Sequence, residues 1–187
     1  MIFPTRPGSY QSGVKTMSQL QLNAEFPFRI LVDITYHYKE ARLQYLFQVV
    51  RAFAEYPVES IDIVVVTNVA EKDKLNNITR LCSPLMDSHP ARPGSKKTLS
   101  IESHPDLADP WHLPCCHKHL ISDRFLDIKT GYTQYIHVED DILVSFDTFC
   151  YFSILRASFR YSRLIPSFLR GEFLSASHRL FLVRHLA

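Results

Sequence analysis

The order of hydrophobic and polar positions predicts that strands and helices alternate along the chain. Residues 28–35 (Phe-Arg-Ile-Leu-Val-Asp-Ile-Thr) and 61–68 (Ile-Asp-Ile-Val-Val-Val-Thr-Asn) are apolar on both faces and rich in β-branched side chains. Such runs are typical of strands that helices cover on both sides. Between them, residues 39–56 carry apolar side chains at three- and four-residue spacing, which predicts a helix with one broad buried stripe. The stripe consists of Leu43, Leu46, Phe47, Val50, Phe53 and Ala54.

Strand, helix and strand of this length form a βαβ unit with a right-handed crossover. We therefore expect an α/β fold. A short helix is predicted at residues 70–81, followed by a loop at 82–97 that contains three prolines and one glycine. The third strand is predicted at residues 98–103, where polar and apolar side chains alternate.

The remaining elements follow a segment rich in proline. A helix is predicted at residues 115–126, with Leu120, Ile121 and Phe125 turned inward, and a strand at residues 134–138. An aromatic-rich helix is predicted at residues 148–161. Residues 164–173 are interpreted as an apolar loop that carries Arg170 and Glu172.

Size and composition indicate one ordinary globular domain. The chain has 187 residues, of which 46% are hydrophobic and 21% charged. Residues 1–25 lack periodicity and are rich in Pro, Gly, Ser and Gln, so we expect a disordered leader followed by a domain at residues 26–187. The formal net charge of +2 is too small to indicate a nucleic acid or an anionic membrane as partner.

The N-terminus and the cysteines bear on the compartment. The first residues lack the apolar core of a signal peptide, and no window approaches the roughly 20 apolar residues that cross a bilayer. We expect the chain, as written, to remain in the cytosol. Its four cysteines contain no C-x-x-C pair, so neither a zinc ribbon nor a disulfide framework is indicated.

Three consecutive carboxylates, Glu139, Asp140 and Asp141, follow the strand at residues 134–138 directly. Like charges this close repel one another unless a cation or positive side chains neutralise them. Hard oxygen ligands at the end of a strand suit Mg²⁺ or Mn²⁺, with the phosphates of a substrate completing the coordination shell. The alternative is a solvated turn ahead of a helix capped by Ser145 or Asp147, and the local sequence leaves both interpretations open.

A second group of metal-ligating residue types lies in and just before the predicted helix at 115–126. On a helix, His112 pairs with Cys116 and Cys115 pairs with His119, so no single face collects four zinc ligands. Core thiols and a polar helix face are the alternative interpretation. The chain also lacks G-x-S-x-G and any glycine-rich phosphate loop, which disfavours a serine hydrolase, Rossmann cofactors and P-loop nucleotides.

The order of these elements resembles the GT-A glycosyltransferases. The first strand is followed by Thr35, the second ends in Thr67-Asn68, and the third predicted helix carries His117-Lys118. The segment Tyr135-Ile-His-Val-Glu-Asp-Asp-Ile is similar to the DxD motif of that fold in a Glu-Asp-Asp form. The resemblance implies a Rossmann-like mixed sheet flanked by helices, a Mn²⁺ or Mg²⁺ cofactor, and a nucleotide-diphosphate sugar as ligand.

The resemblance also implies roles for individual residues. Asp141 would bind the metal, and Glu139 and Asp140 would contact the sugar side, with Glu139 assisting as a second metal ligand. Thr35, Arg42 and Asn68 would lie near the base of the nucleotide. Lys118 would lie near a phosphate. Arg170 would add a positive contact to the diphosphate, unless it only pairs with Glu172. Alternatively, the four residues near the base and the phosphate are polar side chains exposed to solvent, or they cap helices.

The sequence departs from that family after Glu172. A GT-A enzyme continues with acceptor-binding elements and often a catalytic carboxylate, whereas the last residues here do not resemble them. We therefore expect the C-terminal acceptor part to be missing, with weak donor binding and poor or absent transfer. No catalytic residue, acceptor, nucleotide or sugar is identified by the sequence. The competing hypothesis is a non-catalytic α/β fragment or binding module in which the acidic turn is only structural.

Overall fold

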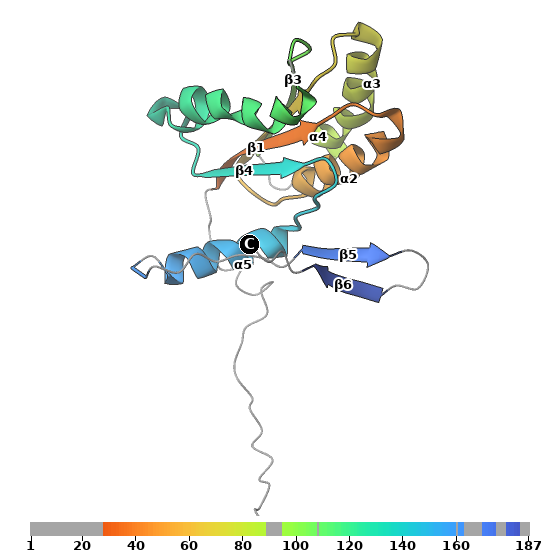
Figure 1. Cartoon of the computed structure of the whole chain (residues 1–187). Helices are drawn as coiled ribbons and strands as arrows, with labels where there is room; N and C mark the ends of the chain where they lie inside the picture. Colours follow the sequence, from red (N-terminus) through yellow and green to blue (C-terminus); the bar gives the residue numbers. More distant parts are fainter. Residues whose placement is uncertain are drawn as a thin grey trace, which may run out of the picture. The chain divides into compact units, whose positions relative to one another are not determined.

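The structure, a computed structural model, divides into two compact units, Met1–Val144 and Ser145–Ala187 (Figure 1). It describes residues 28–88, 95–107, 109–159, 161–162, 170–174 and 179–183. The predicted leader at 1–25 lies outside the described residues, and the predicted bounds of a single domain stay a prediction. Among the described residues, no helix is both long and apolar enough to cross a membrane.

The first unit alternates strands and helices, as the sequence predicts. Its elements are β1 Arg29–Tyr36, η1 Glu40–Arg42, α2 Leu43–Ala54, β2 Ser60–Thr67, α3 Lys72–Cys82, α4 Pro84–Ser88, β3 Lys96–Ser103, η2 Pro110–His117, η3 Leu120–Phe125, η4 Ile128–Thr130 and β4 Gln134–Glu139. The described elements of the second unit are α5 Phe146–Ser158, β5 Arg170–Leu174 and β6 Arg179–Val183. The α/β fold class is therefore confirmed.

Four strands of the first unit form one sheet in the order β3-β2-β1-β4, and every pair in it is parallel. The expected mixed sheet is wrong for these strands, because each returns by a crossover that restores the same direction. The described antiparallel pair, β5 with β6, is a separate sheet. Since β2 and β3 lie on one side of β1 and β4 on the other, the strand order reverses between β1 and β4.

Both faces of the two central strands, β1 and β2, are buried. On one face, Leu31, Val64 and Val66 form a core cluster with Leu113 of η2 and Leu120 of η3. The opposite face is also buried, as the intervening residues of β1 show, and α2, α3 and α4 contact β2 or β3. The continuous apolar runs of β1 and β2 follow from this coverage, because a parallel strand inside the sheet has no face turned to water.

The predicted helix at residues 39–56 is confirmed, as a short 3₁₀ turn that leads into α2. Five of its six predicted inward residues are buried, and only Phe47 is partly exposed. The predicted loop at 82–97 is wrong in part, since it contains α4. Pro84 is the first residue of α4, a position where a missing N–H costs nothing. The predicted apolar loop at 164–173 is likewise wrong at its end, where β5 begins.

The predicted helix at residues 115–126 is irregular. A 3₁₀ segment, η2, contains Pro114 and is followed by the π-helix η3. A proline inside a helix removes one backbone hydrogen bond, which accounts for the departure from α geometry. Leu120 is buried, and Phe125 packs against the same core cluster, so these predicted inward positions are confirmed. Residues 110–125 are called the η2–η3 segment below.

Gly131 ends η4 in a left-handed conformation, with φ 70° and ψ 20°. We expect Gly131→Ala to lower the free energy of unfolding by about 1–2 kcal/mol, because a Cβ is strained there. A Cβ would also lie 2.5 Å from Nη1 of Arg29, the flexible end of a side chain. Gly131→Asn places the same Cβ but tolerates this backbone better, so urea unfolding should show a smaller loss. Equal losses would mean that the contact with Arg29 dominates.

Candidate functional site

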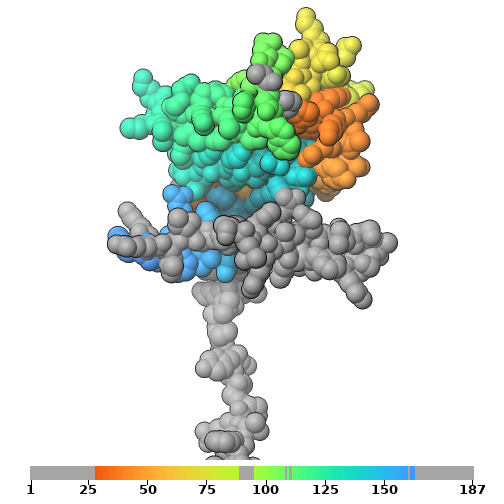
Figure 2. All heavy atoms as spheres, in the orientation of Figure 1, coloured from red at the N-terminus to blue at the C-terminus, as the bar shows by residue number. Residues whose placement is uncertain are grey.

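A cavity of about 360 Å³ opens at the carboxyl ends of β1 and β4. It is lined by Thr35, His37, Lys39, Arg42, Trp111, Leu113, Pro114, Glu139 and Asp140. In open α/β sheets, ligands bind outside the carboxyl ends of the strands where the strand order reverses. The cavity lies at that point of this sheet. The η2–η3 segment, which supplies Trp111, Leu113 and Pro114, forms a continuous outer layer on the face seen in Figure 2, coloured green to teal.

Thr35 lines this cavity from the end of β1. It is the seventh residue of β1 and pairs with Glu139 of β4 in the parallel register. The residue is only 5% exposed, and its Oγ1 is buried without a hydrogen-bond partner in the described structure. Buried hydroxyls are normally hydrogen-bonded, so Oγ1 is an unsatisfied polar atom beneath the cavity wall.

Arg42 offsets part of the negative charge of the acidic turn, residues 139–141. Its Nε and Nη2 atoms donate to the two carboxylate oxygens of Asp140, each at 2.8 Å, and Nη2 also lies 3.2 Å from Oδ2 of Asp141. Asp140 is 3% exposed. Burial raises the pKa of this carboxyl above its ordinary value, and the Arg42 guanidinium opposes that rise. The guanidinium of Arg42, which lies just before α2, thus offsets part of the repulsion among the three carboxylates.

The other members of the acidic turn remain accessible. Glu139 is exposed and lines the cavity, whereas Asp141 is exposed beside it and does not line it. The chain turns directly after β4, where the amide of Asp140 donates to the Thr35 carbonyl at 3.1 Å. This bond holds the acidic turn against the end of β1.

Not all predicted site residues meet at the cavity. Asn68 accepts a hydrogen bond from the Tyr38 amide at 2.9 Å and lies 3.4 Å from Nε2 of His37, so it holds the segment after β1 rather than lining the cavity. Lys118 is exposed and does not line the cavity either. Arg170 lies in β5, where side chains are outside the described structure. Four predicted residues, Thr35, Arg42, Glu139 and Asp140, do share the cavity.

Sequence reasoning missed the other five cavity residues, of which His37, Lys39 and Trp111 carry a polar or aromatic side chain suited to ligand contact. The first two follow β1 directly, which is a signal that the sequence offered, because loops at the carboxyl ends of strands carry the ligand contacts in this fold class. Trp111 offered a weaker signal as the only tryptophan of the chain. Its side chain is 86% exposed at the cavity wall.

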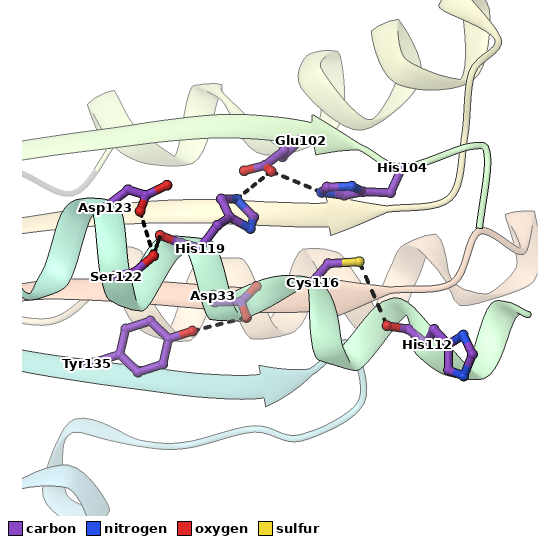
Figure 3. A network of polar contacts seen from close by, with 9 residues as sticks. All are labelled: Asp33, Glu102, His104, His112, Cys116, His119, Ser122, Asp123 and Tyr135. Atoms are coloured by element: carbon purple, nitrogen blue, oxygen red, sulfur yellow. Dashed lines mark hydrogen bonds and ion pairs between the residues drawn. The ribbon is translucent and has the colours of Figure 1, made fainter. Parts of the chain in front are cut away.

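Two groups of metal-ligating side chains lie where the η2–η3 segment covers the sheet. The first contains Asp33, His117 and His137. Asp33 is fully buried. Its Oδ2 lies 2.7 Å from Nδ1 of His137 and accepts a hydrogen bond from the Tyr135 hydroxyl at 3.3 Å. Its other oxygen, Oδ1, has no hydrogen-bond partner among the described residues. Burial, reinforced by the Asp33 charge, raises the pKa of Tyr135. Figure 3 shows Tyr135 directed at Asp33.

The second group contains Glu102 of β3, His104 just after that strand, and His119 of the η2–η3 segment. The Nε2 atoms of the two histidines lie 2.9 Å and 2.6 Å from Oε1 of Glu102 (Figure 3). The histidines that the sequence places on one irregular helix are therefore divided between two groups. Each group is completed by residues from the strands.

No protein-family model matches the chain, and neither a curated protein nor a solved structure is significantly similar to it. The resemblance to GT-A glycosyltransferases therefore stays a prediction.

Proposed function

We propose that the cavity binds a nucleotide-diphosphate sugar and that the chain is the donor-binding part of a metal-dependent GT-A glycosyltransferase. The observation that carries this proposal is the meeting of Thr35, Arg42, Glu139 and Asp140 around one cavity at the point of strand reversal. Their convergence at the usual ligand position of an α/β sheet supports a common ligand.

The chemistry of the cavity suits a ligand with a diphosphate and a flat ring. Lys39 and Arg42 supply positive charge, and Arg42 is held in place by its two bonds to Asp140. Trp111 offers an exposed aromatic face on which a base or a sugar can stack. Cations and an aromatic surface in one cavity favour an anionic, ring-containing ligand.

The residues present fit a Mn²⁺ or Mg²⁺ ion. Both oxygens of Asp140 are taken by Arg42, and Oδ2 of Asp141 lies 3.2 Å from the same guanidinium. The carboxylates that would hold the ion are therefore Glu139 and Asp141, the latter through its other oxygen. One or two carboxylates suffice for these ions when substrate phosphates complete the shell. The ion would stabilise negative charge that develops on the departing diphosphate. Arg42 then positions Asp140 and Asp141 and keeps their combined charge low enough for the turn to stay folded.

A second candidate function has its own support. Arg42 pairs with Asp140 and lies close to Asp141, so two of the three carboxylates of the acidic turn have a positive partner within the protein. This arrangement favours a non-catalytic α/β binding module whose acidic turn is structural. The two candidates differ in whether ligand binding needs a divalent ion.

Isothermal titration of the full chain with nucleoside diphosphates, with and without Mn²⁺, separates them. We expect binding that depends on Mn²⁺ and that weakens at least about tenfold in Asp141→Ala, equivalent to about 1.4 kcal/mol. Glu71→Ala is the matched control, because Glu71 is an exposed carboxylate whose ion pair is with Lys74; it should bind as the unmodified chain does. Equal affinity in excess chelator, or an unchanged Asp141→Ala variant, would exclude the metal-dependent function and leave the binding module.

A further inference from the structure

Glu102, His104 and His119 converge from separate parts of the fold. Glu102 precedes the last residue of β3, His104 follows that strand, and His119 comes from the η2–η3 segment. Their candidate donor atoms all lie within 4.8 Å of one another. The imidazole rings are inclined at 56° with centroids 5.8 Å apart, so they do not stack face to face. Both rings direct Nε2 toward one oxygen of the carboxylate (Figure 3).

Hydrogen bonding accounts for only one contact of this group, the bond between Nε2 of His104 and Oε1 of Glu102. In the part of the chain that the structure describes, Nε2 of His119 is buried and makes no hydrogen bond of acceptable geometry, although it lies 2.6 Å from Oε1 of Glu102. A second nitrogen, Nε2 of His104, meets the same oxygen at 2.9 Å. Two imidazole nitrogens and a carboxylate oxygen therefore lie close together, and one of the nitrogens does not have the geometry of a hydrogen bond. This arrangement resembles the ligands around a cation.

The other histidine group differs in this respect. Nδ1 of His137 is paired with Asp33, and Nδ1 of His117 is paired with the Pro114 carbonyl. Bonds within the protein therefore already account for one nitrogen of each ring. A bond through Nδ1 also orients many metal-ligating histidines, so it does not exclude that group. Glu102, His104 and His119 are preferred because Nε2 of His119 points at the carboxylate and has no hydrogen bond among the described residues.

The donor set indicates the class of cation. Two imidazoles and one carboxylate form the ligand set of zinc sites that keep a fourth position open, and imidazole favours zinc-like transition metals over Mg²⁺ or Mn²⁺. The three side chains are 28–38% exposed, so solvent reaches the group. We propose that Glu102, His104 and His119 bind a zinc-class transition metal, in a site separate from the acidic turn. The fourth ligand is then water or a ligand molecule.

Titration of the full chain, freed of metal, with Zn²⁺ and with Co²⁺ as a spectroscopic probe tests this site. We expect one tight equivalent of Zn²⁺ and a visible Co²⁺ absorption that Zn²⁺ abolishes. His119→Asn and Glu102→Gln should each weaken Zn²⁺ binding by at least about 100-fold. Loss of a residue that only hydrogen-bonds a metal ligand costs up to about that much, and loss of a ligand itself should cost no less. His112→Asn is the matched control, an exposed histidine of the same segment outside the group, and should bind unchanged.

Zn²⁺ affinity that His119→Asn and Glu102→Gln both leave intact would overturn the proposal. If His137→Asn then abolishes that affinity, the ion binds at the group of Asp33, His117 and His137 instead. Circular dichroism of each variant verifies that the chain is folded when it is titrated. No nucleotide is present in this experiment, so its outcome is independent of the proposed donor site.

Discussion

Replacing Arg42 by alanine is expected to lower the free energy of unfolding by about 2–3 kcal/mol at pH 7. This is less than for a fully buried ion pair, because the Arg42 side chain is 32% exposed. Asp140 is 3% exposed, and both its oxygens depend on this guanidinium. Without Arg42 a buried carboxylate has no counterion and cannot easily be hydrated. Urea unfolding followed by circular dichroism measures the loss.

The loss should depend on pH with a defined sign. Burial already raises the pKa of Asp140, and removing Arg42 raises it further because the opposing charge is gone. Below about pH 4, near the ordinary carboxyl pKa, the group is protonated in the folded and the unfolded chain, so little penalty remains. As the pH rises, the unfolded chain releases this proton first, and the variant loses stability until its raised pKa is passed.

Two variants control for other effects of the substitution. The double variant Arg42→Ala/Asp140→Asn removes the unpaired charge and should recover most of the stability. Arg51→Ala removes an exposed arginine of the same helical region, paired with Glu55, and should cost no more than about 1 kcal/mol. A loss that is the same at pH 3.5 and pH 7, or that persists in the double variant, would contradict the assigned role of Arg42.

Phe53→Ala is expected to destabilise the chain by about 3–5 kcal/mol, through lost burial and the cavity left behind. Phe53 is fully buried on α2, and its ring packs against Tyr56 with centroids 5.2 Å apart. Tyr45→Ala on the same helix is the matched control; Tyr45 is 50% exposed, and its loss should stay within about 0.5 kcal/mol. Similar losses for both variants in urea unfolding would mean that α2 presents a different face to the core.

Local pattern predicted the parts of the fold that burial dictates. β1 and β2 were predicted within one residue at each end, because strands covered on both faces need unbroken apolar, β-branched runs. α2 was predicted from its stripe for the same reason. Where the pattern met proline, it failed: Pro84 was interpreted as a loop residue although it begins α4, and the η2–η3 segment departs from α geometry around Pro114.

The site was only half predictable, because its contacts join distant parts of the chain. Arg42 and Asp140 are 98 residues apart, and no local sequence pattern in either segment predicts that they pair. Their meeting requires β4 to lie beside β1, a choice of strand order that periodicity does not encode. The histidines show the same limit, since His119 gains its partners Glu102 and His104 only when the η2–η3 segment crosses the sheet. Residue types were readable from sequence, but partners were not.

The position of Trp111 has a practical consequence. It is the only tryptophan of the chain, and its indole is 86% exposed on the wall of the cavity. Intrinsic fluorescence excited at the indole band therefore originates from a single point, and that point is beside the proposed ligand. A molecule that covers the ring would shift or quench this emission, so occupancy of the cavity can be followed in unlabelled protein.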